Sequence, residues 1–218
     1  MAGYVAQGGQ EQSSATLEPS ARSRGRKPGA TRELISVTRP KGDSPVDFYE
    51  VIRTRRSVRS FRPDPVPADI LERVLDAARI APSGSNRQPW TFVVVRDPDR
   101  KKTLAHLCND QGFIATAPIV IVACGRDIRY NRGGYMGPCS MLVDVAIAMD
   151  HLVLAARAEG LGACWIGSFD NSAIKRFLGV PDDVQIVALT PLGYPQGNPF
   201  EPTASRHPLG EIVREEQW

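Results

Sequence analysis

Hydrophobic positions along the chain follow two periodicities, and the first to appear is helical. Apolar residues recur at helical spacing from position 48 onward, after Ser44, which can cap a helix that has Pro45 in its first position. A second helix is predicted to begin at Pro67 and to end before Pro82. The apolar stripe of this second helix comprises Ile70, Leu71, Val74, Leu75 and Ala78.

Short β-branched runs mark the predicted strands. Residues 91–95 and 119–123 are of the kind that is buried on both faces of a sheet, and residues 184–192 form a third apolar run. Residues 164–166 form a fourth, shorter run. Helical stretches separate these runs, so the pattern predicts helices packed on a sheet, in a mixed α/β or α+β sandwich.

The most hydrophobic stretch of the chain lies between residues 140 and 159. It is apolar almost all the way round, which suits a helix buried in a core or in a subunit interface. Gly160 can end this helix with a left-handed cap. Asp170 can cap a further short helix that runs to Leu178.

Residues 1–43 differ from the rest, being rich in Gly, Ser, Gln and Arg, and they predict a flexible extension ahead of a catalytic domain at 44–218. Seven Lys or Arg and four Asp or Glu lie in residues 1–44, so this part accounts for the whole net charge of +3. Nucleic-acid binding is not favoured, because Tyr4 is the one aromatic residue and no binding module is recognisable. A docking segment for a partner and a mis-assigned start site are the alternatives.

Composition places the chain among globular proteins. It has 218 residues, of which 42% are apolar and 23% charged. No run approaches the roughly 20 apolar residues of a membrane span, and the first thirty residues lack the apolar core of a signal peptide. We therefore expect a cytoplasmic protein without a membrane partner.

Metal chemistry is not predicted. The cysteines are widely spaced without a C-x-x-C pair, and buried free thiols are expected. They are Cys108, Cys124, Cys139 and Cys164. The histidines show no zinc-binding spacing, and His151, on the apolar helix, is expected to be a hydrogen-bonded core residue. No G-x-G-x-x-G follows a strand, so a Rossmann dinucleotide site is not supported.

Three segments carry residue types that are poor choices for building a core. The first, RRSVR at residues 55–59, follows the first predicted helix; guanidinium groups bind phosphate bidentately, although a solvated charge run is the alternative. The second, APSGSNRQPW at 81–90, offers many hydrogen-bonding groups, with an ordinary turn as the alternative. The third, ACWIGSFD at 163–170, ends a strand at a glycine, where a flat ligand can approach the backbone.

Together these segments resemble the nitroreductase family of flavoproteins, over roughly residues 48–213. The R-R-S-x-R motif of that family matches residues 55–59, and its P-S-x-x-N-x-Q-P-W loop matches 82–90. Its late G-Y-P turn matches 193–195, and its closing R-x-P-L matches 206–209. Four motifs in the right order carry the resemblance.

This resemblance implies an α+β fold with a central mixed, mainly antiparallel sheet flanked by helices. It also implies a homodimer with an extensive helical interface and two FMN sites, each built from both chains. NAD(P)H would bind only transiently, as the hydride donor. No side chain is expected to act as a catalytic acid or base, because the flavin N5 would carry the chemistry.

The resemblance also implies roles for individual basic residues. Arg55, Ser57 and Arg206 would hold the FMN phosphate. Arg56 and Arg59 would lie along the ribityl chain and the N1/O2 edge of the ring, where positive charge stabilises the reduced cofactor.

The remaining implied contacts come from the two other segments. The second subunit would supply Pro82, Ser83, Gly84, Ser85 and Asn86. Trp165 and Ile166 would cover one face of the ring, and a backbone N–H of Gly167 or Ser168 would point at N5.

Two positions depart from the family pattern. Many members carry an acidic residue near the N5-facing turn, where this chain has Gly167 and Ser168. A basic residue often precedes the closing arginine by two positions, where this chain has Ala204. Phosphate binding is therefore expected to rest more heavily on Arg55 and Arg206.

The sequence thus predicts a ping-pong oxidoreductase that passes hydride from NAD(P)H to an electron-poor acceptor such as a nitroaromatic or a quinone. A second hypothesis is reductive dehalogenation, because residues 81–84 and 89–95 resemble the corresponding loop of the iodotyrosine deiodinase branch. No lid insertion of that branch is found between Leu104 and Pro118. A third hypothesis is an FMN-binding protein whose extension docks a partner. The physiological acceptor and the choice of nicotinamide stay open.

Overall fold

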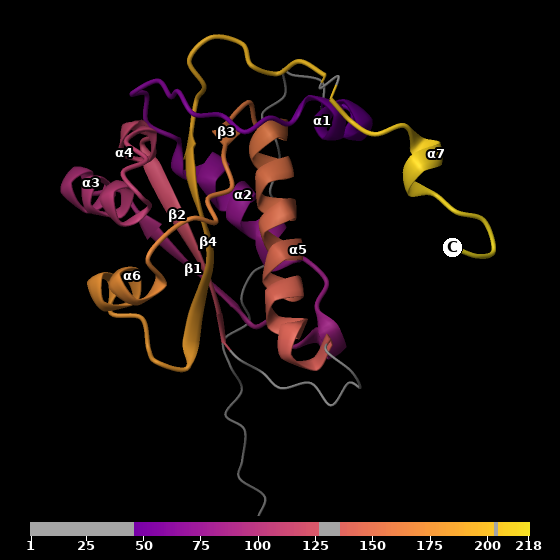
Figure 1. Cartoon of the computed structure of the whole chain (residues 1–218). Coiled ribbons are helices and arrows are strands. Elements are labelled where there is room, and N and C mark those ends of the chain that lie inside the picture. Colours follow the sequence, from indigo (N-terminus) through magenta and orange to yellow (C-terminus); the bar gives the residue numbers. More distant parts are fainter. Residues whose placement is uncertain (1–45, 127–135, 203–204) are drawn as a thin grey trace, which may run out of the picture. The chain divides into compact units, whose positions relative to one another are not determined.

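The computed structural model describes residues 46–126, 136–202 and 205–218 (Figure 1). The predicted extension at 1–43 lies outside the described residues, as do Ser44 and Pro45. The elements in chain order are α1 (Phe48–Thr54), α2 (Ala68–Arg79), the 3-10 turn η1 (Gly84–Asn86), β1 (Trp90–Val95), α3 (Pro98–Leu107), α4 (Phe113–Thr116), β2 (Ile119–Arg126), α5 (Met136–Ala158), β3 (Gly162–Ala163), α6 (Asn171–Leu178), β4 (Val184–Gly193) and α7 (Leu209–Ile212).

Helix α1 begins three residues later than a Pro45 start requires. Its cap is Asp47, whose carboxylate accepts hydrogen bonds from the backbone N–H groups of Tyr49 (2.9 Å) and Glu50 (3.2 Å). A side-chain acceptor at this position satisfies N–H groups that the first turn of a helix leaves without a partner. The predicted helix is therefore confirmed, and its predicted start was wrong.

The four described strands form one sheet in the order β1-β2-β4-β3, and every neighbouring pair is antiparallel. A single parallel bridge joins Ser57 to Ala163 of β3 among the described residues. The α+β prediction with a mainly antiparallel sheet is thus confirmed. The predicted run at 164–166 was shifted, because β3 covers 162–163 and Ile166 forms only an isolated bridge to Leu189.

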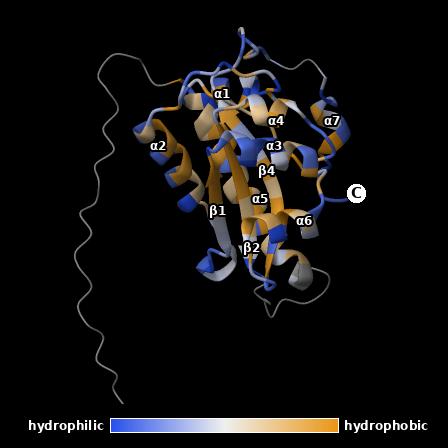
Figure 2. Cartoon of the chain, turned by 90° about the vertical axis from the view of Figure 1, so that its left-hand side faces the viewer, coloured by the Kyte–Doolittle hydropathy of each residue, from blue (hydrophilic) through white to orange (hydrophobic). Residues whose placement is uncertain are grey.

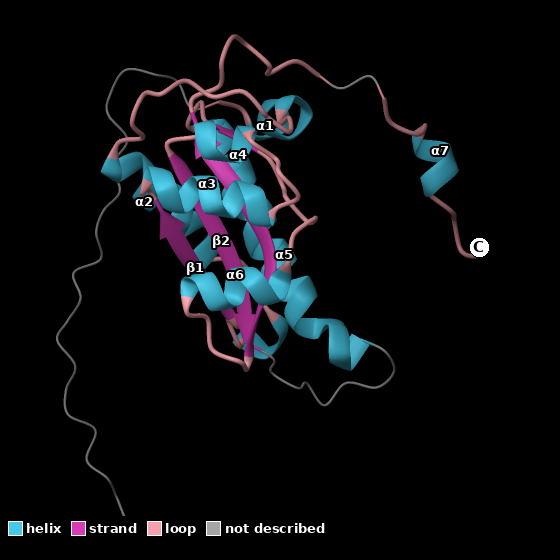
Figure 3. Ribbon diagram, turned by 60° about the vertical axis from the view of Figure 1, so that its left-hand side comes forward, coloured by secondary structure: helices cyan, strands magenta, loops and turns pink. Residues whose placement is uncertain are grey.

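Helices cover both faces of the sheet. Strand β2 is buried from Ile119 to Gly125, so its alternate side chains enter two different cores. One core lies between the sheet and helices α2 and α5, and the other lies between the sheet and α3, α4 and α6 (Figure 3). Hydrophobic residues accordingly run along β1, β2 and β4 (Figure 2). A near-continuous apolar run is what a strand needs when water reaches neither face.

Helix α3 was not predicted, because its apolar signal is weak. Its buried positions include Leu104 and Ala105. Lys101 is also buried, since it is only 7% exposed. The ammonium group of Lys101 donates to the backbone oxygen of Ala117 at 2.6 Å. A lysine stem therefore fills a core position that a hydrophobic pattern does not register.

Helix α5 is the central helix of the fold. By length and composition alone it could cross a membrane, since Cys139–Ala158 has a mean hydropathy of 1.7. The expectation that no segment approaches such a span was therefore wrong for this helix. In the fold α5 packs against α2 and the sheet, and Val145, Met149 and Leu152 are fully buried. These contacts make it a core helix, in agreement with the prediction for 140–159. It ends at Ala158, and Gly160, two residues later, has the predicted left-handed φ of 74°.

The close approach of β3 to the segment after α1 depends on Gly162. A Cβ atom at this position would lie 2.7 Å from Cβ of Val58. We expect Gly162→Ala to lower the free energy of unfolding by about 1–3 kcal/mol, the usual cost of overpacking, as measured by urea denaturation. Gly112→Ala is the control, because nothing lies within 4 Å of its added Cβ. Equal stability of the two variants would contradict the close packing.

Candidate active site

The basic segment 55–59 is held along β3. The backbone N–H of Val58 donates to the carbonyl of Ala163 at 2.9 Å, and Ser57 forms the parallel bridge to the same residue. The Val58 side chain is 4% exposed and packs in a small core with Phe61 and Ala117. Its neighbours on either side, Ser57 and Arg59, are exposed. One buried valine thus fixes the segment and leaves Ser57 and Arg59 facing solvent.

The guanidinium groups of this segment carry positive charge that no described carboxylate neutralises. Within the ranges that the structure describes, Arg55, Arg56 and Arg59 form no ion pair. The guanidinium carbon of Arg59 lies 6.0 Å from the ring centroid of Phe113, at the edge of cation–π range. Clustered cations without carboxylates are suited to a phosphate or another multivalent anion.

The basic segment 55–59 forms the first wall of the candidate site. Residues 165–168, which follow β3 directly, form the second wall. Trp165 is 43% exposed, whereas Ile166 is buried and exchanges two backbone hydrogen bonds with Leu189 (2.9 and 3.1 Å). Gly167 and Ser168 are exposed, and their backbone N–H groups donate to no other described residue. The sheet therefore anchors Ile166 and presents next to it an aromatic face and two N–H groups. Ile166 supports this wall from within, and its contact with a ring face stays a prediction.

The turn between α3 and α4 touches this second wall, a contact that the sequence did not predict. The side-chain amide of Asn109 donates to the hydroxyl of Ser168 at 2.6 Å, and that of Gln111 donates to the Ser168 carbonyl at 3.4 Å. Asn109 and Asp110 both have left-handed backbone, with φ of 57° and 56°. Asn and Asp tolerate that conformation best after glycine, so an Asn-Asp pair between two helices was an available signal.

Cys164 lies between these two walls and is buried. Burial raises the pKa of its thiol, while the nearby charge of Arg59 and the Ser57 side chain act in the opposite direction. The net effect of burial disfavours the thiolate, which is the form that acts as a nucleophile. The prediction of buried free thiols is confirmed here and for Cys108 and Cys124, while Cys139 is partly exposed.

The loop that contains η1 is held in strained backbone conformations. Ser85, Asn86 and Gln88 have φ of 51°, 55° and 50°, the left-handed region. The N–H of Gly84 donates to the carboxylate of Asp144 on α5 at 3.0 Å, and Asp144 is only 5% exposed. Non-glycine residues in this region cost energy and concentrate at functional sites, which supports the prediction that this loop binds a ligand.

Within a single chain, this loop does not reach the basic segment 55–59 or the wall at residues 165–168. Asp144, which anchors the loop, is 14 residues before Ala158, where α5 ends, a distance of about 21 Å along the helix. Strand β3 and helix α1 lie at the end of α5 near Ala158 (Figure 1). The structure therefore joins the segments 55–59 and 165–168 and leaves the loop from Pro82 to Asn86 apart from them.

Arg206 is also not brought to the basic segment. It lies in a stretch, 205–218, in which every residue is exposed, and its guanidinium donates to the carbonyl of its neighbour Ser205 at 2.6 Å. Ala204, at which the family pattern is broken, falls outside the described residues.

Two buried charges on α5 were not singled out from the sequence, although both were visible there. Asp144 anchors the η1 loop, and Arg157 lies at the other end of the helix and contacts α1. Each is a charged residue in a largely apolar stretch, and buried charges persist only with partners. His151 forms the predicted hydrogen bond, since its Nδ1 lies 3.2 Å from the carbonyl oxygen of Ala77, but it is only partly buried. No group of three metal-ligating side chains occurs among the described residues.

Comparisons with known proteins agree with this arrangement. The model of the nitroreductase family matches residues 52–131 and 105–194. The NADH dehydrogenase of Thermus thermophilus is 33% identical over 188 residues, covering 73% of this chain and 91% of that protein. Human iodotyrosine deiodinase 1 is 28% identical over 199 residues, covering 77% of this chain and 68% of that protein.

Solved structures show the same fold. A nitroreductase family protein from Clostridium novyi superposes with a TM-score of 0.65 at 37% identity, covering 71% of this chain and 88% of that one. The NADPH:FMN oxidoreductase of Vibrio harveyi, solved with NAD+, superposes with a TM-score of 0.71 at 25% identity, covering 78% and 77%. The family match spans well over half of the chain, the first of these relatives is one-third identical, and the fold is shared. The chain is therefore an oxidoreductase that belongs to the nitroreductase family.

Proposed function

We propose that this oxidoreductase binds FMN and transfers hydride from NAD(P)H to an electron-poor organic acceptor. The observation that carries the proposal is the surface formed by the basic segment 55–59 and residues 165–168 on either side of β3. There, three guanidinium groups without ion-pair partners among the described residues adjoin an exposed Trp165 and the unbonded N–H groups of Gly167 and Ser168. A phosphorylated, flat, polar heterocycle has the features that this surface complements.

The residues present fit FMN. Arg55 and Ser57 would hold the phosphate, and Arg56 would lie along the ribityl chain. Arg59 would place positive charge at the N1/O2 edge, where it stabilises negative charge on the ring. When bound, FMN would supply a ring that accepts hydride at N5 from NAD(P)H and donates it to the acceptor.

The chain itself would contribute binding and shielding. Trp165 would cover one face of the ring and keep water from it, and a backbone N–H at Gly167 or Ser168 would orient the reacting edge by a hydrogen bond. No side chain need act as acid or base. Because no separate dinucleotide site is predicted, NAD(P)H and acceptor would occupy the same place in turn, which is a ping-pong mechanism.

The separation of the η1 loop from the other walls supports a homodimer. Apolar side chains on neighbouring helices α1 and α5 are exposed in the single chain. They are Phe48 (62%), Tyr49 (64%), Ile52 (44%), Leu142 (46%) and Val143 (39%). Exposed apolar side chains on neighbouring helices are typical of a protein interface. A two-fold axis across it would bring the loop of one chain to the basic segment of the other.

Reduction of the bound cofactor is the direct test of this proposal. We expect the purified protein to carry flavin absorbance, and we expect anaerobic NADH or NADPH to bleach it in the absence of acceptor. A nitroaromatic or a quinone added afterwards should restore the absorbance with one acceptor consumed per cofactor. Protein that is colourless and also fails to bind added FMN would overturn the proposal.

Dehalogenation is the alternative, since deiodinases are among the relatives. The stretch from Leu104 to Pro118 holds the end of α3, a turn and the four residues of α4, without room for a lid. A catalytic lid that recognises an amino acid has therefore no counterpart there. Iodotyrosine included in the acceptor panel separates the two activities, and we expect it to be the poorer acceptor.

A further inference from the structure

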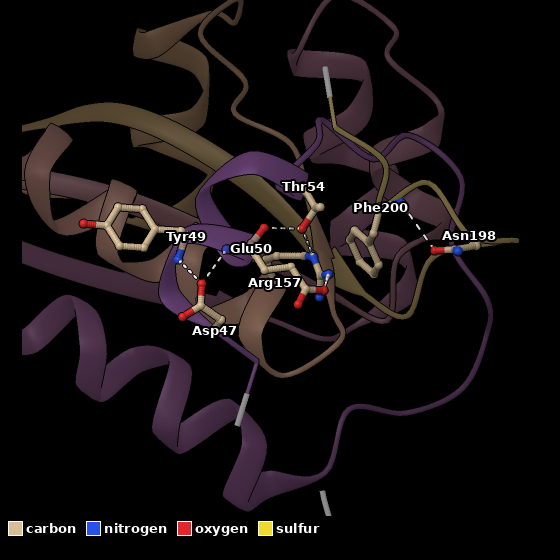
Figure 4. A network of polar contacts seen from close by, with 7 residues as sticks. All are labelled: Asp47, Tyr49, Glu50, Thr54, Arg157, Asn198 and Phe200. Atoms are coloured by element: carbon tan, nitrogen blue, oxygen red, sulfur yellow. Dashed lines mark hydrogen bonds and ion pairs between the residues drawn. The ribbon is translucent and has the colours of Figure 1, made fainter. Parts of the chain in front are cut away.

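One buried cation at the end of α5 connects three segments of the chain. Arg157 is 8% exposed, and its Nε donates to the hydroxyl of Thr54 at 2.9 Å (Figure 4). Its Nη2 lies 3.6 Å from a carboxylate oxygen of Glu50, and its guanidinium carbon lies 4.2 Å from the ring centroid of Phe200. The Thr54 hydroxyl in turn donates to the carbonyl of Glu50 at 2.6 Å.

These contacts have the directions that a guanidinium requires. The donor edge of the group faces the hydroxyl and the carboxylate on α1, while the ring of Phe200 lies on its other side (Figure 4). A planar cation can donate in its plane and pack on an aromatic ring with its face, which an ammonium group cannot do. Phe200 also packs against the small core that contains Val58. The cluster therefore adjoins the basic segment on two sides.

Each connected segment reaches the basic segment of the proposed cofactor site. Thr54 immediately precedes Arg55. Arg157 is six residues before Ala163, on which Ser57 is held, and Phe200 packs against the small core that contains Val58. We propose that Arg157 is a positioning residue that fixes these segments relative to one another and so sets the affinity for FMN. This inference rests on the proposed function.

The chain contains a matched pair that tests whether Arg157 acts only on stability. Arg73 of α2 forms two hydrogen bonds with Glu159, just after α5, at 3.0 and 2.9 Å. The two side chains are 15% and 13% exposed, so this ion pair is also largely shielded from water. It joins α2 to the same end of α5 without contacting α1 or Phe200 among the described residues. Loss of either arginine should therefore lower stability, whereas only loss of Arg157 should lower the affinity for FMN.

The experiment compares Arg157→Met with Arg73→Met in the full chain. Apoprotein is titrated with FMN by fluorescence quenching, and the urea midpoint of each variant is measured without FMN. We expect Arg157→Met to raise the Kd for FMN about tenfold, and Arg73→Met to leave it within about twofold at a comparable loss of stability. Equal Kd values for the two variants, or parallel changes in Kd and stability, would overturn the inference.

Two further variants keep the test decisive if Arg157→Met folds poorly. Thr54→Val removes the acceptor at nearly constant volume, and Arg157→Lys retains the charge without the planar group. We expect each to raise the Kd by about threefold to fivefold, and Thr54→Val combined with Arg157→Met to be no worse than Arg157→Met alone, because both remove one contact. Unchanged Kd in Thr54→Val and Arg157→Lys would also overturn the inference. A wild-type chain that binds no FMN would instead overturn the proposed function.

Discussion

Replacement of Arg55 by alanine is expected to raise the Kd for FMN by about 10- to 100-fold, with little change in the affinity for riboflavin. The reason is that a charge-assisted hydrogen bond to phosphate contributes about 1.5–3 kcal/mol, and riboflavin lacks the phosphate. Arg55 has no carboxylate partner among the described residues, so the substitution should leave no buried charge uncompensated. Equilibrium titration of the apoprotein with both ligands measures the effect.

Arg53→Ala is the matched control for this substitution. Arg53 is exposed in the last turn of α1, two residues away, and its removal changes the net charge by the same amount. If the basic segment attracted FMN only through its overall charge, both variants would weaken binding equally, and increasingly so at low salt. A selective effect of Arg55→Ala would show that this guanidinium contacts the phosphate.

The largest effect is expected from mixing two variants, each with one damaged part of the site, at an FMN concentration below their raised Kd values. Arg55→Ala disables the basic segment, and Ser85→Asp places a carboxylate in the η1 loop at a left-handed position that aspartate tolerates. If each site takes the basic segment of one chain and the loop of the other, a mixed dimer contains one intact site. Random exchange of subunits should therefore restore about a quarter of the wild-type sites, from nearly none.

The same mixture discriminates against a site built within one chain. In that case every chain would carry one damaged wall, and mixing would restore nothing. Each variant subjected to unfolding and refolding by itself provides the baseline, and bound flavin per chain is the measured quantity. A mixture no better than its components would contradict the shared site while leaving the Arg55 result intact.

The sequence was sufficient to predict elements whose buried residues follow a regular helical or strand periodicity. The stripe of α2 and the runs of β1, β2 and β4 were predictable because an apolar residue stands wherever the chain meets a core. Helix α3 was not, because the stem of Lys101 occupies one of its buried positions. The start of α1 was misplaced because Ser44 and Asp47 are both good caps, and pattern alone does not choose between them.

The candidate site divides in the same way. Motif resemblance located the basic segment and the turn after β3, and the bridge from Ser57 to Ala163 confirms that these two are neighbours. The contact of Asn109 with Ser168 and the cluster around Arg157 depend on residues far apart in the chain. Such contacts have no local signature, because they arise from the packing of elements and not from the order of residues within one.

Helix α5 has a consequence for how this protein can be altered. It carries the anchor of the η1 loop at Asp144 and the cluster of Arg157 thirteen residues later. One inserted or deleted residue between them would rotate one anchor relative to the other by about 100° and shift it by about 1.5 Å. Insertions and deletions should therefore be placed outside this part of α5. The five-residue turn between α3 and α4 is a suitable position for them. Grafting longer turns there offers a route to new acceptors on an unchanged frame.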